Sequence, residues 1–188
     1  DLARFPNVSL KLPALGQLAP RQIGRPLPVD GSPVLDPGPG GIAIEALDAK
    51  NPPHFKGGAN AWHFSRCHGL TLRNIRLGGQ TANGLNLDDG GDLDNPTTGI
   101  TIERVEVRDI GPKGNHDGIK CSGLDKLTIR DCTITGWGGQ GIDFVGCHHS
   151  LITGCRFTGK EGFTASAAIQ LKGGTSDVIV EKCRFTDA

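Results

Sequence analysis

Apolar positions recur along this chain at a fixed interval. Residues 118–121, Gly-Ile-Lys-Cys, return 23 residues later as residues 141–144, Gly-Ile-Asp-Phe. The apolar residues keep their places, whereas the polar residue between them changes from Lys120 to Asp143. Such self-similarity indicates a repeated structural unit with a constant interior and a variable surface.

Each unit opens with an apolar residue, a polar residue and a second apolar residue. In a β-strand, successive side chains point to opposite faces, so the outer two residues face inward and the middle one outward. The pattern predicts short strands at residues 62–64, 85–87, 119–121, 142–144 and 169–171.

A second group of inward positions follows in every unit. In the first unit these are Leu70, Leu72, Ile75 and Leu77, at intervals of two, three and two residues. The intervals of two are typical of strands. The interval of three adds one residue and predicts a bend between two strands.

The units recur after 23 to 34 residues, and the longest gap contains the Asp-rich stretch 88–96. A leucine-rich repeat would need a regular Leu-Asn framework and a helical return segment, and neither pattern is present. Gly, β-branched residues and Cys fill the units instead. We therefore expect an all-β, single-stranded parallel β-helix of about five coils, with equivalent residues stacked about 4.8 Å apart.

The pattern "GI-x-Φ-x-G", followed by segments like "LTIRDCTI", resembles the right-handed parallel β-helix proteins of the pectate lyase-like superfamily. The resemblance covers residues 57–188 and implies a right-handed coil. Members of that group include polysaccharide lyases, hydrolases and epimerases. The fold supports many activities, so the resemblance implies polysaccharide chemistry without choosing a reaction.

The first 41 residues contain eight of the twelve prolines, which excludes a long helix or central strand there. Only residues 8–12, Val-Ser-Leu-Lys-Leu, alternate as a strand does. We expect residues 1–56 to form a Pro-rich extended segment, as a cap or as first irregular coils. Residues 57–188 form the repeat domain in this interpretation.

Charge and hydropathy argue against a nucleic-acid partner and against a membrane-spanning segment. Lys plus Arg equals Asp plus Glu at 20 each, so the bulk attraction of a nucleic-acid binder is missing. No apolar run reaches the roughly 18 to 20 residues that span a bilayer. The chain starts at Asp1 without any Met, so we expect a processed, secreted or periplasmic protein with no membrane insertion.

Stacking of the first strands predicts one outward column of polar residues. A row of mixed donors and acceptors at that spacing fits an extended polar polymer such as a polysaccharide, although any solvated strand face is also polar. His116 adjoins this face beside Asp117, and Gln140 and Lys172 flank it. The column itself consists of His63, Asn86, Lys120, Asp143 and Gln170.

Two reactions are consistent with this column. In the first, β-elimination on a uronic acid, Lys120 is the base if its pKa is lowered, whereas Asp143 beside it acts to raise that pKa. Lys172 or Arg66 would neutralise the substrate carboxylate.

In the second reaction, hydrolysis, Asp117 and Asp143 are the paired carboxylates. Residues 115–119, "NHDGI", resemble the Asn-x-Asp-Gly segment of polygalacturonases, with Asp117 at the matching position. The chain departs from that family at Gly139-Gln140, where a pair of Asp is expected, and it lacks the later Gly-His-Gly segment.

Two further features concern metals and cysteines. Four closely spaced carboxylates, Asp88, Asp89, Asp92 and Asp94, offer the hard oxygen ligands that Ca²⁺ prefers, without the EF-hand spacing. The six cysteines fall on inward positions with no zinc-ligand spacing, so we expect unpaired thiols that pack as small apolar groups.

A non-catalytic role, as a surface adhesin, spike or filament unit, is the remaining alternative. Aromatic residues are scarce, with Trp62 expected inside and Trp137 in a turn. The repeat runs to Phe185 without a polar cap. We therefore expect the natural chain to continue beyond Ala188, or a second copy to associate end to end with the last coil.

Overall fold

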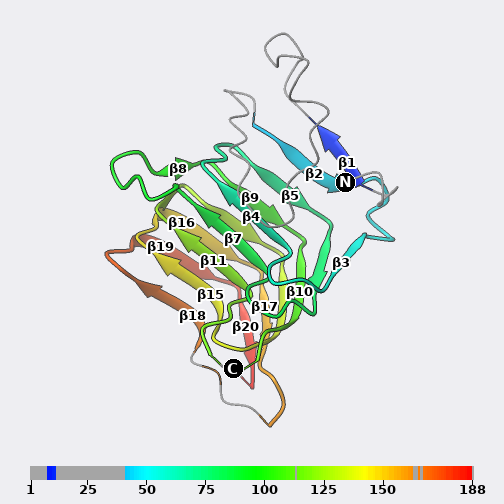
Figure 1. Cartoon of the computed structure of the whole chain (residues 1–188). Coiled ribbons are helices and arrows are strands. Elements are labelled where there is room, and N and C mark those ends of the chain that lie inside the picture. Colours follow the sequence, from blue (N-terminus) through cyan, green and yellow to red (C-terminus); the bar gives the residue numbers. More distant parts are fainter. Residues whose placement is uncertain (1–7, 12–40, 113, 163–164, 166, 188) are drawn as a thin grey trace.

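The structure is a computed structural model, which describes residues 8–11, 41–112, 114–162, 165 and 167–187. Regular structure in these residues consists of β-strands, which follow one another around a coil (Figure 1). No helix among them is long and apolar enough to cross a membrane. The prediction of a parallel β-helix with about five turns is confirmed.

Three parallel sheets form the walls of the coil, and sheet B contains the first strand of each predicted unit. Its strands pair in parallel with the predicted register, so that Ile119 lies between Leu85 and Ile142. In chain order they are β4 (Trp62–Ser65), β7 (Leu85–Asp88), β11 (Ile119–Ser122), β15 (Gln140–Val145) and β18 (Ala167–Lys172).

Sheet A follows sheet B along the chain, and short strands and an antiparallel strand extend it. Its parallel strands are β2 (Ala43–Ala46), β5 (Thr71–Arg73), β9 (Thr101–Glu103), β13 (Thr128–Arg130), β16 (His148–Thr153) and β19 (Ser176–Glu181). The additional strands are β8 (Thr97–Thr98), β12 (Leu124–Asp125) and β1 (Val8–Lys11), which pairs antiparallel with β2.

Sheet C closes the coil, and each of its strands comes directly after a strand of sheet A. Its strands are β3 (His54–Lys56), β6 (Arg76–Gly78), β10 (Glu106–Ile110), β14 (Thr133–Trp137), β17 (Arg156–Thr158) and β20 (Arg184–Thr186). β2 and β3 pair in parallel with β5 and β6, so they belong to a coil that precedes residue 57. The proline-rich residues 12–40 lie outside the described residues.

The extra residue in the second strand group is the predicted bend between sheets A and C. Asn74, Arg104, Asp131 and Lys182 occupy it with φ angles of 54°, 51°, 54° and 54°, and Gly154 occupies it in the remaining coil. This left-handed conformation is uncommon for residues with a Cβ. Its recurrence shows that the coil geometry, and not the local residue type, sets the corner.

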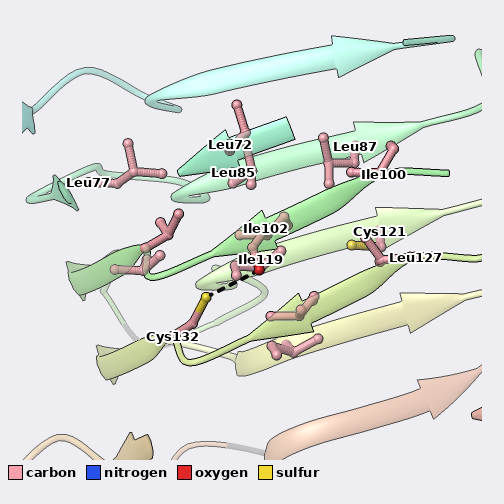
Figure 2. Close-up of a cluster of buried hydrophobic side chains, with 14 of the residues drawn as sticks. Leu72, Leu77, Leu85, Leu87, Ile100, Ile102, Ile119, Cys121, Leu127 and Cys132 are labelled. Carbon is pink, nitrogen blue, oxygen red and sulfur yellow. Dashed lines mark hydrogen bonds between the residues drawn. The ribbon is translucent and has the colours of Figure 1, made fainter. Parts of the chain in front are cut away.

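Inward columns of Leu, Ile, Val and Cys fill the space between the sheets (Figure 2). The six cysteines are free thiols, as expected, and five of them are buried. Cys132 Sγ donates a weak hydrogen bond to the Ile102 carbonyl oxygen at 3.7 Å (Figure 2). Trp137 does not lie in a turn: it ends β14, is buried, and packs edge-on against Phe157. Its indole therefore belongs to the core.

The last coil leaves part of the apolar interior exposed. Phe185 stacks on Phe157 with ring centroids 5.0 Å apart, yet half of its surface faces solvent. Leu171 and Val180, which also continue inward columns, are 44% and 40% exposed. β18, β19 and β20 lie at this end of the stack (Figure 1), so these side chains leave an uncovered apolar surface there.

Candidate functional site

The outer face of sheet B carries the predicted column of polar residues. The strand register places His63 beside Asn86, Asn86 beside Lys120, Lys120 beside Asp143, and Asp143 beside Gln170. Each step is one coil, so residues 23 to 34 positions apart in sequence become neighbours. The proposed column therefore exists as a continuous row on one face.

Lys120 lies between two buried carboxylates at the centre of this row. Its Nζ is 3.1 Å from Asp143 Oδ2, with hydrogen-bond geometry, and 3.6 Å from Asp117 Oδ2. Both Asp side chains are fully buried, whereas 27% of the Lys120 side chain is exposed. The ammonium group thus covers both carboxylates and shields them from solvent.

Lys172 adds a second cation from the neighbouring coil. Its Nζ lies 3.0 Å from Asp143 Oδ1, in an ion pair without hydrogen-bond geometry, and it donates to Gln170 Oε1 at 3.0 Å. Asp143 is therefore flanked by Lys120 on one side and Lys172 on the other. Two ammonium groups and two carboxylates form a compact cluster, the Lys120 cluster, made of Asp117, Lys120, Asp143 and Lys172.

Asp117 also belongs to a ladder of side chains beside the column. The Asn60 side-chain oxygen accepts the backbone N–H of Asn83 at 3.0 Å, and that of Asn83 accepts the N–H of Asp117 at 2.7 Å. Asp117 Oδ1 in turn accepts the N–H of Gln140 at 3.0 Å. One oxygen of Asp117 is therefore used to hold the next coil, and only Oδ2 faces Lys120.

Burial raises the pKa of Asp117 above its ordinary value, even though the Gln140 N–H bond and the Lys120 charge oppose the shift. Its Oδ2 has no hydrogen-bond partner among the described residues. A carboxyl group in this environment holds a proton more readily than an exposed one. Asp117 therefore has the properties of a proton donor, provided that a substrate reaches it.

Lys120 does not have the lowered pKa that the elimination hypothesis required. Burial acts to lower its pKa, but the hydrogen bond and charge of Asp143, together with the charge of Asp117, outweigh burial and raise it. Lys120 is accordingly a protonated cation at neutral pH. The structure favours a role in contacting anionic groups and disfavours Lys120 as the base.

A second polar cluster lies on the same face, on β4 and β7 of the two preceding coils. Asp88 accepts hydrogen bonds from Ser65 Oγ and the Gly90 N–H, and its Oδ2 pairs with His63 Nε2. Burial acts to raise the pKa of Asp88, but these hydrogen bonds more than compensate and lower it. Asp88 is therefore an ionised group that fixes the orientation of the His63 imidazole.

The carboxylates of the Asp-rich insertion do not converge on one point. Asp88 faces His63 and Ser65, Asp89 is buried with Oδ1 accepting the Gly91 N–H, and Asp92 accepts from the Asn95 amide. Asp94 is exposed. No three His, Cys, Asp or Glu side chains of the described residues are arranged to hold a metal ion. The described carboxylates form no metal site in this arrangement, and calcium binding stays a prediction from sequence alone.

Two adjoining hollows give access to the face. The first lies over the first three residues of the column and is lined by His63, Asn83, Asn86, Leu87, Asp88, Lys120 and Ser122. The second lies between sheet B and the insertion, whose Gly90, Gly91 and Leu93 line it together with Val145 and Gly173. His63, Asp88 and Ser122 line both hollows, so the two are continuous.

The remaining predicted residues have structural contacts. The His116 carbonyl oxygen accepts the N–H groups of Gly138 and Gly139, and the residue is half-buried. The Gln140 side chain is buried, and Gln170 is half-buried beside Lys172. None of these three lines either hollow.

Sequence reasoning missed two contacts at this site. It placed Asp88 in a metal site, although its position next to Ser65 and one coil from His63 could have indicated a hydrogen-bonded group. It also missed the ladder bond of Asp117. The repeated side-chain oxygens of Asn60, Asn83 and Asp117 at equivalent positions were the available signal.

Comparison with known proteins supports the fold and leaves the chemistry open. The model of a family described as "Right handed beta helix region" matches residues 58–188. A search of curated proteins found no match, and a search of solved structures found none either.

Proposed function

Because the chain belongs to the right-handed β-helix family, whose fold leaves the reaction open, we propose that sheet B binds and cleaves an acidic polysaccharide. The reaction we propose is β-elimination at a uronic acid residue. The protein would meet such a polymer as a secreted or periplasmic protein.

One observation carries the proposal: the protonated Lys120 lies in a hollow that also contains the imidazole of His63. A uronate carboxylate is an anion of the size and charge that an ammonium group binds. Lys172, 41% exposed on the next coil, offers a second cation. Asn83 and Asn86 supply donors and acceptors for the hydroxyl groups of the sugar.

The proposed step removes the proton on the carbon next to the carboxylate. Lys120 stabilises the negative charge that develops on the carboxylate when this proton leaves. The proton passes to Nδ1 of His63, because Nε2 is bonded to Asp88. The glycosidic C–O bond on the adjacent carbon breaks, a C=C bond forms, and the leaving oxygen takes up a proton from solvent water.

Hydrolysis by Asp117 and Asp143 is the second candidate, and the raised pKa of Asp117 favours it. The geometry opposes it, because one ammonium group contacts both carboxylates at 3.1 and 3.6 Å. Their oxygens are therefore at most near the lower limit of the roughly 6.5 to 9.5 Å that inverting enzymes use for a water molecule. Both groups are also fully buried.

The test is a screen of the purified chain on pectates, alginates and glycosaminoglycans, with two readouts. Elimination produces unsaturated ends that absorb ultraviolet light, together with reducing ends, whereas hydrolysis produces reducing ends only. Lys120→Ala should lower the rate by roughly 10²-fold or more, the usual effect of losing one charge-stabilising group. The control is Lys182→Ala, an exposed lysine in a corner between sheets A and C.

Each outcome of the screen is informative. Reducing ends without ultraviolet absorbance would replace elimination by hydrolysis. Binding without any product would favour the non-catalytic alternative, a surface-binding or filament protein. Full activity of Lys120→Ala, with the fold verified by circular dichroism, would exclude the Lys120 cluster as the site.

A further inference from the structure

Sheet C presents an outer face that the proposed reaction does not use. Its strands pair in register, so the outward residues form two columns along the stack. The first column is His54, Arg76, Glu106, Thr133, Arg156 and Arg184. The second column is Lys56, Gly78, Arg108, Thr135, Thr158 and Thr186.

Cations dominate this face. Its two columns hold five Lys or Arg residues and one carboxylate, Glu106. Arg76 Nε lies 3.2 Å from Glu106 Oε2, and an Arg108 nitrogen lies 3.3 Å from Glu106 Oε1. The whole chain has a formal net charge of zero, so this excess is local and not a consequence of composition.

Arg156 and Arg184 form the least compensated part of the face. They are direct register partners on β17 and β20, and both are exposed. Among the described residues, neither makes an ion pair or a side-chain hydrogen bond. Like charges on adjacent strands repel, so an anion placed between the two guanidinium groups would be stabilising.

The hydroxyl groups beside the arginines have the same periodicity. Thr158 and Thr186 pair on the neighbouring column, and Thr133 and Thr135 follow on β14. On β17 and on β20, a guanidinium group and a hydroxyl group lie side by side, and both can donate to carboxylate or sulfate oxygens. The donors repeat at the strand spacing of about 4.8 Å, which suits a polymer with repeated anionic groups.

The other end of the face is also electropositive. The pKa of His54 is lowered, first by burial and then by the positive charges of Arg108 and Lys56. Positive charge therefore lies toward both ends of the face, and the uncharged outward residues of β14 separate the two groups.

From these observations we propose that the outer face of sheet C, centred on Arg156 and Arg184, is a second binding surface for an anionic polysaccharide. Arginine binds carboxylate and sulfate groups in a bidentate manner, which favours such a ligand. The face has no Phe, Trp or Tyr among its described outward residues, so it lacks the platforms on which nucleic-acid bases stack. The inference does not depend on cleavage at sheet B.

The experiment measures binding of the full chain to heparin, polygalacturonate, uncharged dextran and single-stranded DNA by surface plasmon resonance at low salt. Arg156→Ser combined with Arg184→Ser should weaken binding of one or both anionic glycans at least tenfold. The matched control is Lys126→Ser with Lys182→Ser, which removes the same charge from exposed turn positions. We expect less than a twofold effect from the control.

Heparin and polygalacturonate distinguish sulfate from carboxylate as the preferred group. If the arginine variant and the control variant lose glycan binding equally, the binding comes from general charge attraction, and the inference is overturned. Tight binding of DNA at the same salt concentration would show that the face binds any polyanion and not a glycan in particular.

A Lys172→Ser variant separates this surface from sheet B. If Lys172→Ser removes all glycan binding and the arginine variant removes none, the second surface does not exist. If no glycan is cleaved but the arginine-dependent binding persists, the function proposed for sheet B fails and this inference stands. Thermal unfolding of each variant verifies that it is folded.

Discussion

Asp117 Oδ1 accepts the backbone N–H of Gln140, one coil further along the chain, at 3.0 Å. Asn60 and Asn83 make the equivalent bond at their own positions, so Asp117 continues a ladder that holds successive coils together. Its second oxygen contributes a negative charge to the Lys120 cluster. One residue thus serves the scaffold and the candidate site at once.

Comparison of two substitutions separates these roles. Asp117→Ala should destabilise the protein by about 1 to 3 kcal/mol, because it leaves a buried N–H without a partner. Asp117→Asn keeps an oxygen for the Gln140 N–H and should cost clearly less. Urea unfolding measures the free energy of unfolding of both variants. Equal losses would show that the charge, and not the ladder bond, dominates. Activity retained by Asp117→Asn alone would assign Asp117 a structural role only.

Removal of Lys120 should be costly because two buried carboxylates lose their shared cation. Lys120→Met is expected to destabilise the fold by about 3 to 5 kcal/mol, as when one partner of a buried ion pair is removed. Adding Asp143→Asn should recover part of this loss. Thermal or urea unfolding of the single and double variants checks the coupling. Additive losses would contradict a shared electrostatic cluster.

Glu103 should make the stability of the protein sensitive to acid. Burial acts to raise its pKa, but hydrogen bonds from Arg130 and Arg73 and the charge of Arg104 outweigh burial and lower it. The stabilisation is therefore present above the ordinary pKa of 4.5 and is lost as pH falls through the lower folded pKa.

Glu103→Gln tests this dependence. The variant should be less stable than the wild type at pH 7, by about 1 to 3 kcal/mol, because its hydrogen bonds no longer involve a charged acceptor. The difference should shrink as pH falls below about 4. Urea unfolding across pH 2.5 to 7 provides the measurement. A constant difference over this range would contradict a lowered folded pKa.

The buried thiols should react slowly in the folded protein. Burial raises the pKa of Cys121 and Cys132 well above the usual value and that of Cys147 to about 11, so little thiolate forms near neutral pH. Labelling with a disulfide reagent at pH 8 should reach the half-buried Cys183 first. All six thiols should react after unfolding. Fewer than six after unfolding would reveal disulfides.

We propose that the apolar surface of the last coil causes self-association of this chain. An unpaired strand edge beside exposed apolar residues favours pairing with another copy. Val180→Lys should shift the oligomeric state toward the monomer in sedimentation experiments over a range of concentrations. The control is Leu93→Lys, an exposed apolar residue in the remote insertion. Monomeric wild-type protein at all concentrations would contradict the proposal.

The sequence predicted the sheet B register because the pattern has a structural cause in every coil. An inward residue must be apolar wherever it occurs, so Ile119, Ile142 and Ile169 reveal the alignment from the sequence alone. The bend between sheets A and C followed from the same periodicity. The same periodicity also predicted that Lys120 lies next to Asp143.

The strands of the first coil were harder to predict from the sequence. β2 and β3 lie between prolines and turn residues, and their pairing depends on β5 and β6, which come later in the chain. Trp137 was misplaced because a Gly-Trp-Gly-Gly stretch resembles a turn, whereas contact with Phe157 holds the indole in the core.

The sequence by itself determined the coil, its inward columns and the order of polar groups on its face, because these depend only on local periodicity repeated along the chain. The tertiary structure alone decided that Asp117 and Asp143 are fully buried, that Lys120 is a cation, and that Asp88 holds His63. Burial and protonation depend on groups contributed by several coils at once. Their distances and solvent exposure are properties of the assembled stack, and no single repeat contains them.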